Sequence, residues 1–260
     1  MTIETNLMAE LTWPEYQQRV AADNPYILIP VGALEQHGPH LPMGTDHLLP
    51  YAIAKAVAAE IPAIVAPPFN YGYKSQPRMG GGNHFCGTTS IDGHTLSLLL
   101  RDVLLEFVRH GVKRIAVIDG HYENMMFLTE GIDLALREMR LGGVNDVRIV
   151  RLEYWDFTSE ATLSKVFPNG FPGYALEHAA VMETSMSLHL HPHLVRTDRI
   201  PEDPPAEFPH FDVFPYNLSL IPPSGVLSPA KEASAEKGKL LFDEYVETIS
   251  AALKAEMDRA

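Results

Sequence analysis

The sequence contains a single cysteine, few basic side chains and no long apolar run. Cys86 by itself excludes an internal disulfide and a zinc site built from several thiolates. Lysine and arginine number 20 against 33 aspartates and glutamates, so the net charge of −13 disfavours a nucleic-acid partner. No stretch approaches the roughly 20 apolar residues that span a bilayer, and no basic and apolar leader opens the chain. We therefore expect a soluble, cytoplasmic protein that binds neither a membrane nor a nucleic acid.

The sequence also lacks the signatures of nucleotide binding and of serine hydrolases. Three glycines at 80–82 are followed by Phe85 where a dinucleotide fingerprint needs its last glycine, and no Gly-Lys-Ser/Thr follows. No Gly-x-Ser-x-Gly elbow occurs. These absences disfavour a nucleotide-dependent enzyme and a serine nucleophile. The glycine-rich segment 71–90 better suits a loop close to a small ligand, or else a turn whose polar groups satisfy one another.

Strand-like and helix-like segments alternate along the chain. Apolar runs predict short buried strands at 26–32, 63–69, 114–120 and 147–155. Apolar residues at helical spacing predict helices at 47–60, 94–110, 124–140 and 229–257. Strands that alternate with helices are typical of the α/β class, with a mostly parallel sheet covered by helices. At 260 residues with 46% apolar composition, the chain fits one domain over 1–260.

One segment, 201–223, is dense in proline and cannot continue a helix or a central strand. It carries aromatic and apolar residues, so it does not resemble a flexible linker. We expect an ordered excursion whose apolar side chains anchor it to the domain or to a partner subunit.

Polar residues follow two of the predicted strands. Glu35, His37 and Asp46 come after the first strand in "VGALEQHGPHLPMGTDH", and His121 and Glu123 come after the third in "GHYEN". Ligands collect at the carboxyl ends of parallel strands, so we expect these side chains at one edge of the sheet. Carboxylates and imidazoles suit Zn²⁺ or Mn²⁺, and five ligands exceed what a mononuclear site normally takes. The pattern predicts two divalent metal ions with one bridging carboxylate.

Each of these residues also has an ordinary structural interpretation. A carboxylate after a strand is commonly a solvated loop residue or a helix cap, and Asp46 is a candidate N-cap for the helix that follows. If the metal shells were closed, the protein would be a metal-stabilised binding protein and not an enzyme. The distinction depends on whether an acid or base stands beside the metals.

His178 is the candidate for that acid or base. "GYALEHAAVMETSMSLHL" (173–190) predicts a helix whose first turn holds Glu177 and His178. A histidine at a helix start above a metal site can act as a general acid or base near neutral pH. A buried structural histidine is the alternative. Glu177 faces a different side of such a helix, because residues i and i+1 do not share a face.

Several stretches together resemble the creatininase (creatinine amidohydrolase) family in order and spacing. They are the two metal motifs above and "YGYKSQPRMGGGNHFCGTTSIDG", "YWDF" and "LEHAAVMETS". The resemblance runs from "ELTWPEY" to the C-terminal helix. It implies a three-layer α/β/α fold, two Zn or Mn ions per subunit, a small-molecule substrate and a homohexamer.

The resemblance also implies a distribution of the metal ligands. Glu35 and His121 would bind one metal, His37 and Glu123 the other, and Asp46 would bridge them. In this scheme His178 and Glu123 are the catalytic residues.

The substrate contacts implied by the resemblance depart from creatininase proper at three positions. Tyr122, Trp155, Glu177 and His178 fit the expected substrate site. Met79, however, replaces a serine, while Tyr174 and Ala175 replace a Trp-Asp pair. These changes leave the metal chemistry intact but make the pocket less polar, so they bear on which substrate is accepted.

The resulting prediction is a metal-dependent hydrolase that opens creatinine reversibly to creatine. Hydroxide generated at the metals would attack the carbonyl carbon, and His178 would protonate the leaving nitrogen. The alternative within the family is hydrolysis of another small cyclic amide, formamide, lactone or cyclic ketone.

Overall fold

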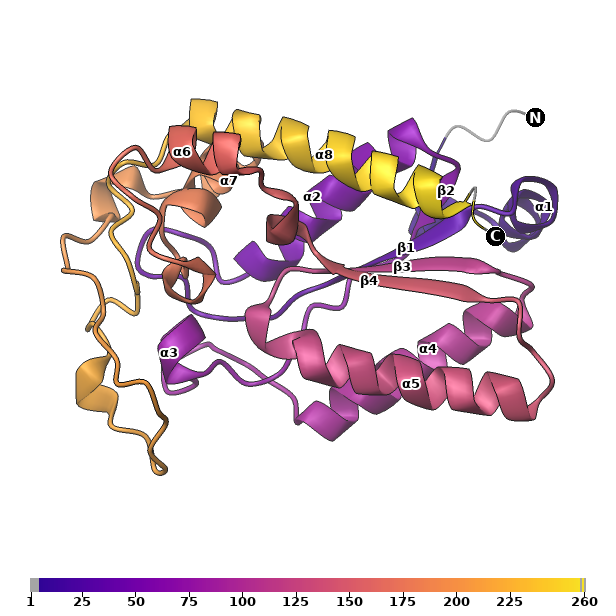
Figure 1. Ribbon diagram of the computed structural model, residues 1–260, viewed down its shortest axis with the longest axis horizontal. Helices are drawn as coiled ribbons and strands as arrows, with labels where there is room; N and C mark the ends of the chain where they lie inside the picture. The colour runs from indigo at the N-terminus through magenta and orange to yellow at the C-terminus, as the bar shows by residue number, and fades with distance from the viewer. Residues whose placement is uncertain (1–4, 258, 260) are drawn as a thin grey trace.

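The computed structural model describes residues 5–257 and 259. A four-stranded sheet lies between two layers of helices (Figure 1). The strands are β1 (Tyr26–Val31), β2 (Ala63–Val65), β3 (Arg114–Asp119) and β4 (Arg148–Glu153). Their order is β2-β1-β3-β4, and every neighbouring pair is parallel. The predicted three-layer α/β/α class with a parallel central sheet is confirmed.

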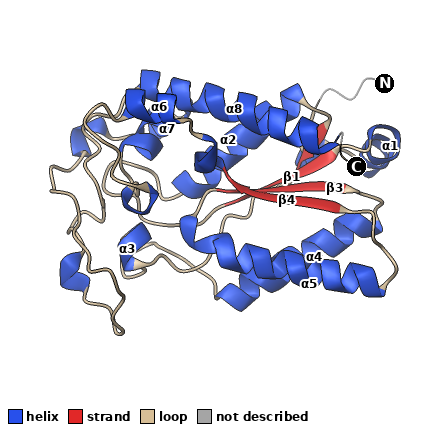
Figure 2. Cartoon of the chain, in the orientation of Figure 1, coloured by secondary structure: helices blue, strands red, loops and turns tan. Residues whose placement is uncertain are grey.

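The helices divide between the two faces of the sheet (Figure 2). One face carries α2 (Thr45–Glu60), α6 (Glu160–Val166), α7 (Val181–Leu190) and α8 (Ala235–Met257). The other carries α4 (Gly93–Arg109) and α5 (Met125–Leu141), which pack on each other. Two further helices lie at the ends of the sheet, α1 (Trp13–Asp23) and α3 (Pro77–Gly80).

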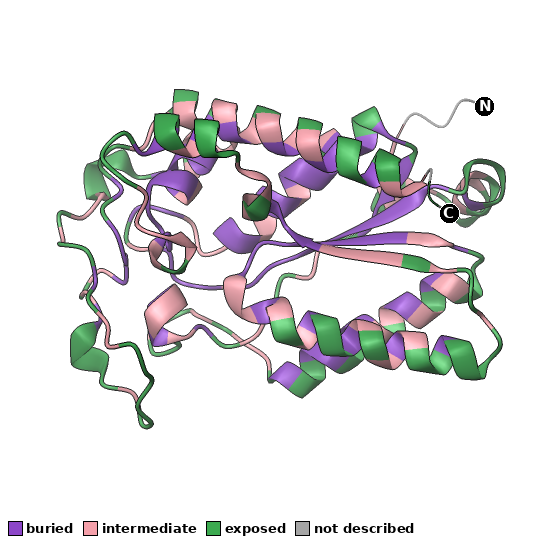
Figure 3. Ribbon diagram, viewed as in Figure 1, coloured by how far each residue is buried: buried purple, intermediate pink, exposed green. Residues whose placement is uncertain are grey.

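The apolar pattern of β1 explains why both faces must be covered. Tyr26 and Leu28 belong to the core beneath α2, α7 and α8, while Ile27 and Ile29 belong to the core beneath α4 and α5. Successive side chains of a strand point to opposite faces of the sheet. A continuous apolar run therefore gives each face apolar side chains, and helices must cover both faces to bury them. Figure 3 shows the result: β1, β2 and most of β3 are buried, the edge strand β4 is partly exposed, and exposed residues lie on the outer faces of the helices.

Several predicted boundaries need correction. The second strand ends at Val65 and not at 69, because Pro67 and Pro68 cannot donate to a ladder. The last helix begins at Ala235 and not at 229, after a turn in which Ser234 Oγ accepts from Lys237 N at 3.3 Å. Helix α1 escaped prediction, although Thr12 and Glu15 form a capping box at its start.

The helix predicted over 173–190 begins only at Val181. A short 3-10 turn covers Tyr174–Leu176, and both Glu177 and His178 lie in the connection before α7. The N-terminus of α7 is nevertheless satisfied, because the Glu177 carboxylate accepts from Val181 N at 3.2 Å and Met182 N at 2.8 Å. Glu177 therefore caps the helix instead of occupying its first turn.

The proline-rich segment forms the ordered excursion that was expected, at the end of the molecule away from both termini (Figure 1). Its apolar side chains are not all anchored, however. Phe211, Val213 and Phe214 are 63%, 53% and 72% exposed in the single chain, so they are free to meet another molecule. Among the described residues, no helix is both long and apolar enough to cross a membrane.

Candidate active site

The predicted ligands converge at the carboxyl ends of β1 and β3. Two glycines make this possible. A Cβ at Gly32, after β1, or at Gly120, after β3, would approach the backbone oxygen of Asp46 to 2.3 Å. Because both positions are glycine, the first turn of α2 can lie directly against the two strand ends. Asp46, His37 and the residues after β3 are thereby buried together.

The carboxylate of Asp46 lies between two imidazoles. Its Oδ1 is 2.9 Å from His37 Nε2, and its Oδ2 is 3.2 Å from His121 Nδ1. The same His121 nitrogen lies 3.0 Å from Glu35 Oε2. One oxygen of Asp46 thus faces each half of the site, which is the arrangement that a bridging ligand requires. Asp46 is within α2 and not its N-cap, a position that Gly44 occupies.

Glu183 was not anticipated from the sequence, yet it completes one half of the site. Its Oε1 is 3.5 Å from His37 Nε2, and its Oε2 accepts from Ala179 N at 2.5 Å. Within the described part of the chain, three groups of residues have closely spaced ligand atoms: Glu35 with Asp46 and His121, His37 with Asp46 and Glu183, and Glu35 with His37 and His178. The only sequence signal was an acidic residue within the apolar run "AAVMETSM".

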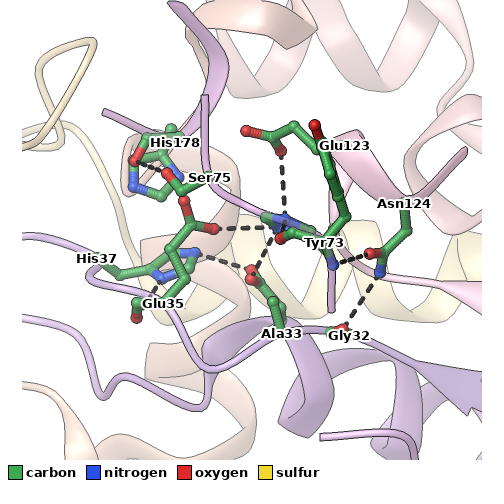
Figure 4. Close-up of polar contacts among 12 residues, drawn as sticks. Gly32, Ala33, Glu35, His37, Tyr73, Ser75, Glu123, Asn124 and His178 are labelled. Atoms are coloured by element: carbon green, nitrogen blue, oxygen red, sulfur yellow. Dashed lines mark hydrogen bonds and ion pairs between the residues drawn. The ribbon is translucent and has the colours of Figure 1, made fainter. Parts of the chain in front are cut away.

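Glu123 lies at the edge of the site. Its Oε1 accepts from Gln76 N at 2.6 Å, and its Oε2 is 3.5 Å from His121 Nε2, the ring nitrogen that faces away from Asp46. The Tyr73 carbonyl lies 3.0 Å from the same nitrogen. Figure 4 shows Glu35, His37, Glu123 and His178 around this centre. The geometry therefore favours Glu183 over Glu123 as the carboxylate that joins His37.

The charges and unpaired polar atoms of the cluster are suited to binding metal cations. Burial raises the pKa of Glu35 to about 8. Burial by itself would lower the pKa of His37, yet the carboxylates of Asp46 and Glu183 raise it well above its usual value. Glu35 Oε1, His37 Nε2 and Asp46 Oδ2 are buried without a partner in hydrogen-bonding geometry. Buried oxygen and nitrogen atoms without hydrogen-bond partners can bind a metal ion, and carboxylate oxygens with imidazole nitrogens are ligands that suit Zn²⁺ or Mn²⁺.

We expect Glu183→Gln to reduce the metal content by about one ion per chain, because it removes a negative ligand from the half that holds His37. Glu123→Gln is the matched control, since it changes a neighbouring carboxylate in the same way and should keep the metals. Elemental analysis of both purified variants makes the comparison. Metal loss in the Glu123 variant with none in the Glu183 variant would restore the original assignment.

His178 lies beside the cluster and is buried. Its ring is 4.4 Å from that of His37, and its Nε2 is 2.8 Å from the side-chain nitrogen of Gln36. Burial lowers its pKa well below the usual value, with His37 contributing in the same direction. The imidazole is therefore neutral around pH 7 and can carry one transferable proton.

A cavity with about 550 Å³ of empty space, including the part open to solvent, rises above the cluster. Its walls are mainly aromatic and methionine side chains, among them Met79, Tyr122, Trp155 and Tyr174. The rings of Tyr122 and Trp155 are nearly parallel, 12° apart with centroids at 6.1 Å. Such walls suit a small, flat and mostly apolar ring.

The structure corrects two of the predicted substrate contacts. Ala175 is exposed and does not line the cavity. Glu177 does line it, but both of its carboxylate oxygens are occupied by the N-terminus of α7. Tyr174 remains at the wall, where its hydroxyl donates to the Trp155 carbonyl at 3.1 Å.

Asn124 supports the site from behind. Its Nδ2 donates to Gly32 O at 3.2 Å and to Asp119 Oδ1 at 3.1 Å, and its Oδ1 accepts from Tyr73 N at 2.8 Å (Figure 4). One buried amide thus joins the loops after β1 and β3 to the loop that carries Tyr73. The sequence pattern could not predict this role, because it depends on how the three loops are arranged in the folded chain.

Comparison with known proteins agrees with this site. The family model for creatininase, creatinine amidohydrolase, matches residues 9–253. The chain is 51% identical to a creatinine amidohydrolase of Pseudomonas putida over 250 residues, 96% of each chain. It is 32% identical to a mycofactocin precursor peptide peptidase of Mycobacterium ulcerans, over 86% of this chain and 82% of the relative.

Solved structures show the same similarity. A crystal structure of creatinine amidohydrolase superimposes with a TM-score of 0.96 at 49% identity, over 98% of each chain. Creatininase structures of the same similarity include a manganese form, with a TM-score of 0.96 at 50% identity over 97% of this chain and 99% of the other. A mutant creatininase of Zn-Zn type has the same TM-score at 49% identity, over 98% and 99% of the two chains.

Proposed function

The chain belongs to the creatininase family, and from this premise we propose that it hydrolyses creatinine to creatine with two divalent metal ions. The observation that carries the proposal is the Asp46 carboxylate between two imidazoles, at the floor of an aromatic cavity. Two ligand groups that share Asp46 support a dinuclear centre. The identity of 51% to a creatinine amidohydrolase supports the substrate.

We assign Glu35, Asp46 and His121 to one metal, and His37, Asp46 and Glu183 to the other. Bound divalent ions lower the pKa of water and polarise a carbonyl group. The protein's part is to hold the ligands close together before the metals bind. Asp46 does this from the start of α2, where the helix dipole also favours its negative charge.

His178 supplies the proton that ring opening needs. Hydrolysis adds the elements of water across the amide bond, with oxygen going to the carbonyl carbon and hydrogen to the ring nitrogen. A nitrogen anion is a poor leaving group, so protonation must accompany cleavage. A neutral imidazole beside the cluster can take a proton from the attacking water and, as the imidazolium, donate it to the ring nitrogen, a contribution on the order of 10²–10⁴-fold in rate.

The cavity walls orient the ring and exclude water. Tyr122 and Trp155 present nearly parallel aromatic faces, and Tyr174 is held to the backbone of Trp155 by its hydroxyl. Met79 adds an apolar contact on the same cavity. A flat ring bound against these faces would place its carbonyl toward the metal ligands below.

Steady-state kinetics on creatinine test the proposal. Zinc- or manganese-loaded protein is expected to form creatine at a rate within the ordinary enzymatic range of about 1–10³ s⁻¹. A protein that holds two metals but does not turn creatinine over would show that the chemistry is right and the substrate wrong. Other small cyclic amides, formamides, lactones and cyclic ketones are then the next panel.

The variant with Met79→Ser, Tyr174→Trp and Ala175→Asp probes the departures from the creatininase pattern. If these residues have retuned the pocket, we expect kcat/KM on creatinine to rise by about tenfold in the variant, because one hydrogen bond contributes roughly 0.5–1.5 kcal/mol net, and one to a charged group about 1.5–3 kcal/mol. Comparison of kcat/KM for the parent and the variant decides this. If the parent is active on creatinine and the triple variant has the same kcat/KM, the three positions do not set specificity.

We further propose that the single domain assembles as a homohexamer in the cytoplasm. The exposed apolar side chains of Phe211, Val213 and Phe214 support assembly, since a monomer gains nothing by leaving them in water. Light scattering on the purified protein measures the mass directly.

A further inference from the structure

We infer that Gln36 is a positioning residue for His178, and that its side-chain amide holds the imidazole in the tautomer protonated on Nδ1. The inference deepens the proposed function, on which the role of His178 rests. Gln36 stands between two metal-ligand candidates in the chain, but its own side chain turns away from them to a different set of partners.

The orientation of the amide follows from its contacts. Gln36 Oε1 accepts from Gly38 N at 2.9 Å, which identifies that end of the amide as the oxygen. The other end, Nε2, donates to two carbonyl oxygens, those of Gly80 and Gly225, each at 3.0 Å. A flipped amide would place its oxygen against the two carbonyl oxygens and its nitrogen against the Gly38 N–H. Only one orientation satisfies all three backbone groups.

This orientation determines the state of His178. The Gln36 nitrogen lies 2.8 Å from His178 Nε2 and cannot accept a hydrogen bond, so its two hydrogens are shared among this ring nitrogen and the carbonyl oxygens of Gly80 and Gly225. The imidazole must therefore present a lone pair at Nε2, and in the neutral ring its hydrogen is on Nδ1. A hydrogen on Nε2 would point at the amide hydrogens. Gln36 thus determines which nitrogen of the neutral ring holds the hydrogen and which holds the lone pair.

The amide also joins His178 to two loops over the site. A Cβ at Gly81 would lie 2.8 Å from Gln36 Nε2, and one at Gly225 would lie 2.2 Å from its Oε1. Both glycines have positive φ, 77° and 78°. The backbone of each loop therefore packs directly on this side chain. Gln36, which is only 7% exposed, therefore connects His178 to three segments: the loop after β1, the glycine-rich loop and the end of the proline-rich excursion.

The test is Gln36→Glu, which keeps the shape of the side chain but replaces the donor by an acceptor. A carboxylate at this position accepts a hydrogen from His178 Nε2, so the tautomer should switch. We expect ¹⁵N NMR of the histidine-labelled, zinc-loaded protein to show an unprotonated Nε2 for His178 in the parent and a protonated one in the variant. The spectrum of His178→Asn assigns the resonances. We expect kcat to fall by about 10–100-fold, with a smaller change in KM.

Gln36→Met provides a second variant without a buried charge. It removes the donor, so the His178 ring should populate both tautomers and kcat should fall less than in the glutamate variant. If Gln36 only supports the loops, both variants would change KM and thermal stability while the His178 nitrogen resonances stayed as in the parent. That result, or a parent with its proton on Nε2, would overturn the inference. Because the NMR measurement needs no substrate, it decides the role of Gln36 even if creatinine is not turned over.

Discussion

Asp46→Asn is expected to lose both metal ions and all measurable hydrolysis. Asp46 has an oxygen within about 3 Å of each imidazole, 2.9 Å from His37 Nε2 and 3.2 Å from His121 Nδ1. It also belongs to both of the ligand groups that we assign to metals. An amide offers one neutral oxygen and an NH₂ group that cannot bind a cation, so one half of the site loses its ligand atom and the other loses a negative charge. Since even the partners of metal ligands are worth about 10–100-fold in affinity, loss of a bridging ligand should exceed that.

Elemental analysis after gel filtration measures the effect, with thermal unfolding to confirm that the variant is folded. Asp102→Asn is the control, because Asp102 is exposed on α4 and pairs only with the neighbouring Arg101. The control should retain the parent's metal content. If Asp46→Asn still held two metals per chain, Asp46 would not be the bridging ligand.

His178→Asn is expected to keep both metals and lose about 10²–10⁴-fold in kcat. The residue is buried beside His37 with its Nε2 toward the Gln36 amide, and we propose that it transfers a proton and binds no metal. The competing interpretation is that His178 is a ligand, because its ring also lies in a group with Glu35 and His37. Metal content and turnover measured on the same sample separate the two.

The control for this variant is His193→Asn, which alters an exposed histidine beyond the end of α7. Its metal content and kcat should equal those of the parent. If His178→Asn loses one metal together with its activity, the acid role fails and the residue becomes a third ligand of one ion. If it keeps both metals and full activity, the proton must come from elsewhere.

Much of this architecture could be predicted because its determinants are local. Apolar runs around Leu28 and Val117 bury both faces of a strand, and this pattern depends only on the alternation of side chains along an extended backbone. The residues right after two such strands reach the same edge in any parallel sheet. For that reason Glu35, His37 and His121 could be grouped before any contact was known.

The remaining features depend on contacts between segments far apart in the chain. Glu183 reaches His37 only because α7 packs beside α2, and Gln36 meets His178 and Gly225 across 142 and 189 residues of chain. The start of α7 is instead a local effect, because the carboxylate of Glu177 accepts from backbone N–H groups only four and five residues later. Residue pattern determined most of the elements, although not all of their ends. Tertiary packing decided which carboxylate lies beside His37 and which nitrogen of His178 faces Gln36, because both depend on atoms that come close together only in the folded chain.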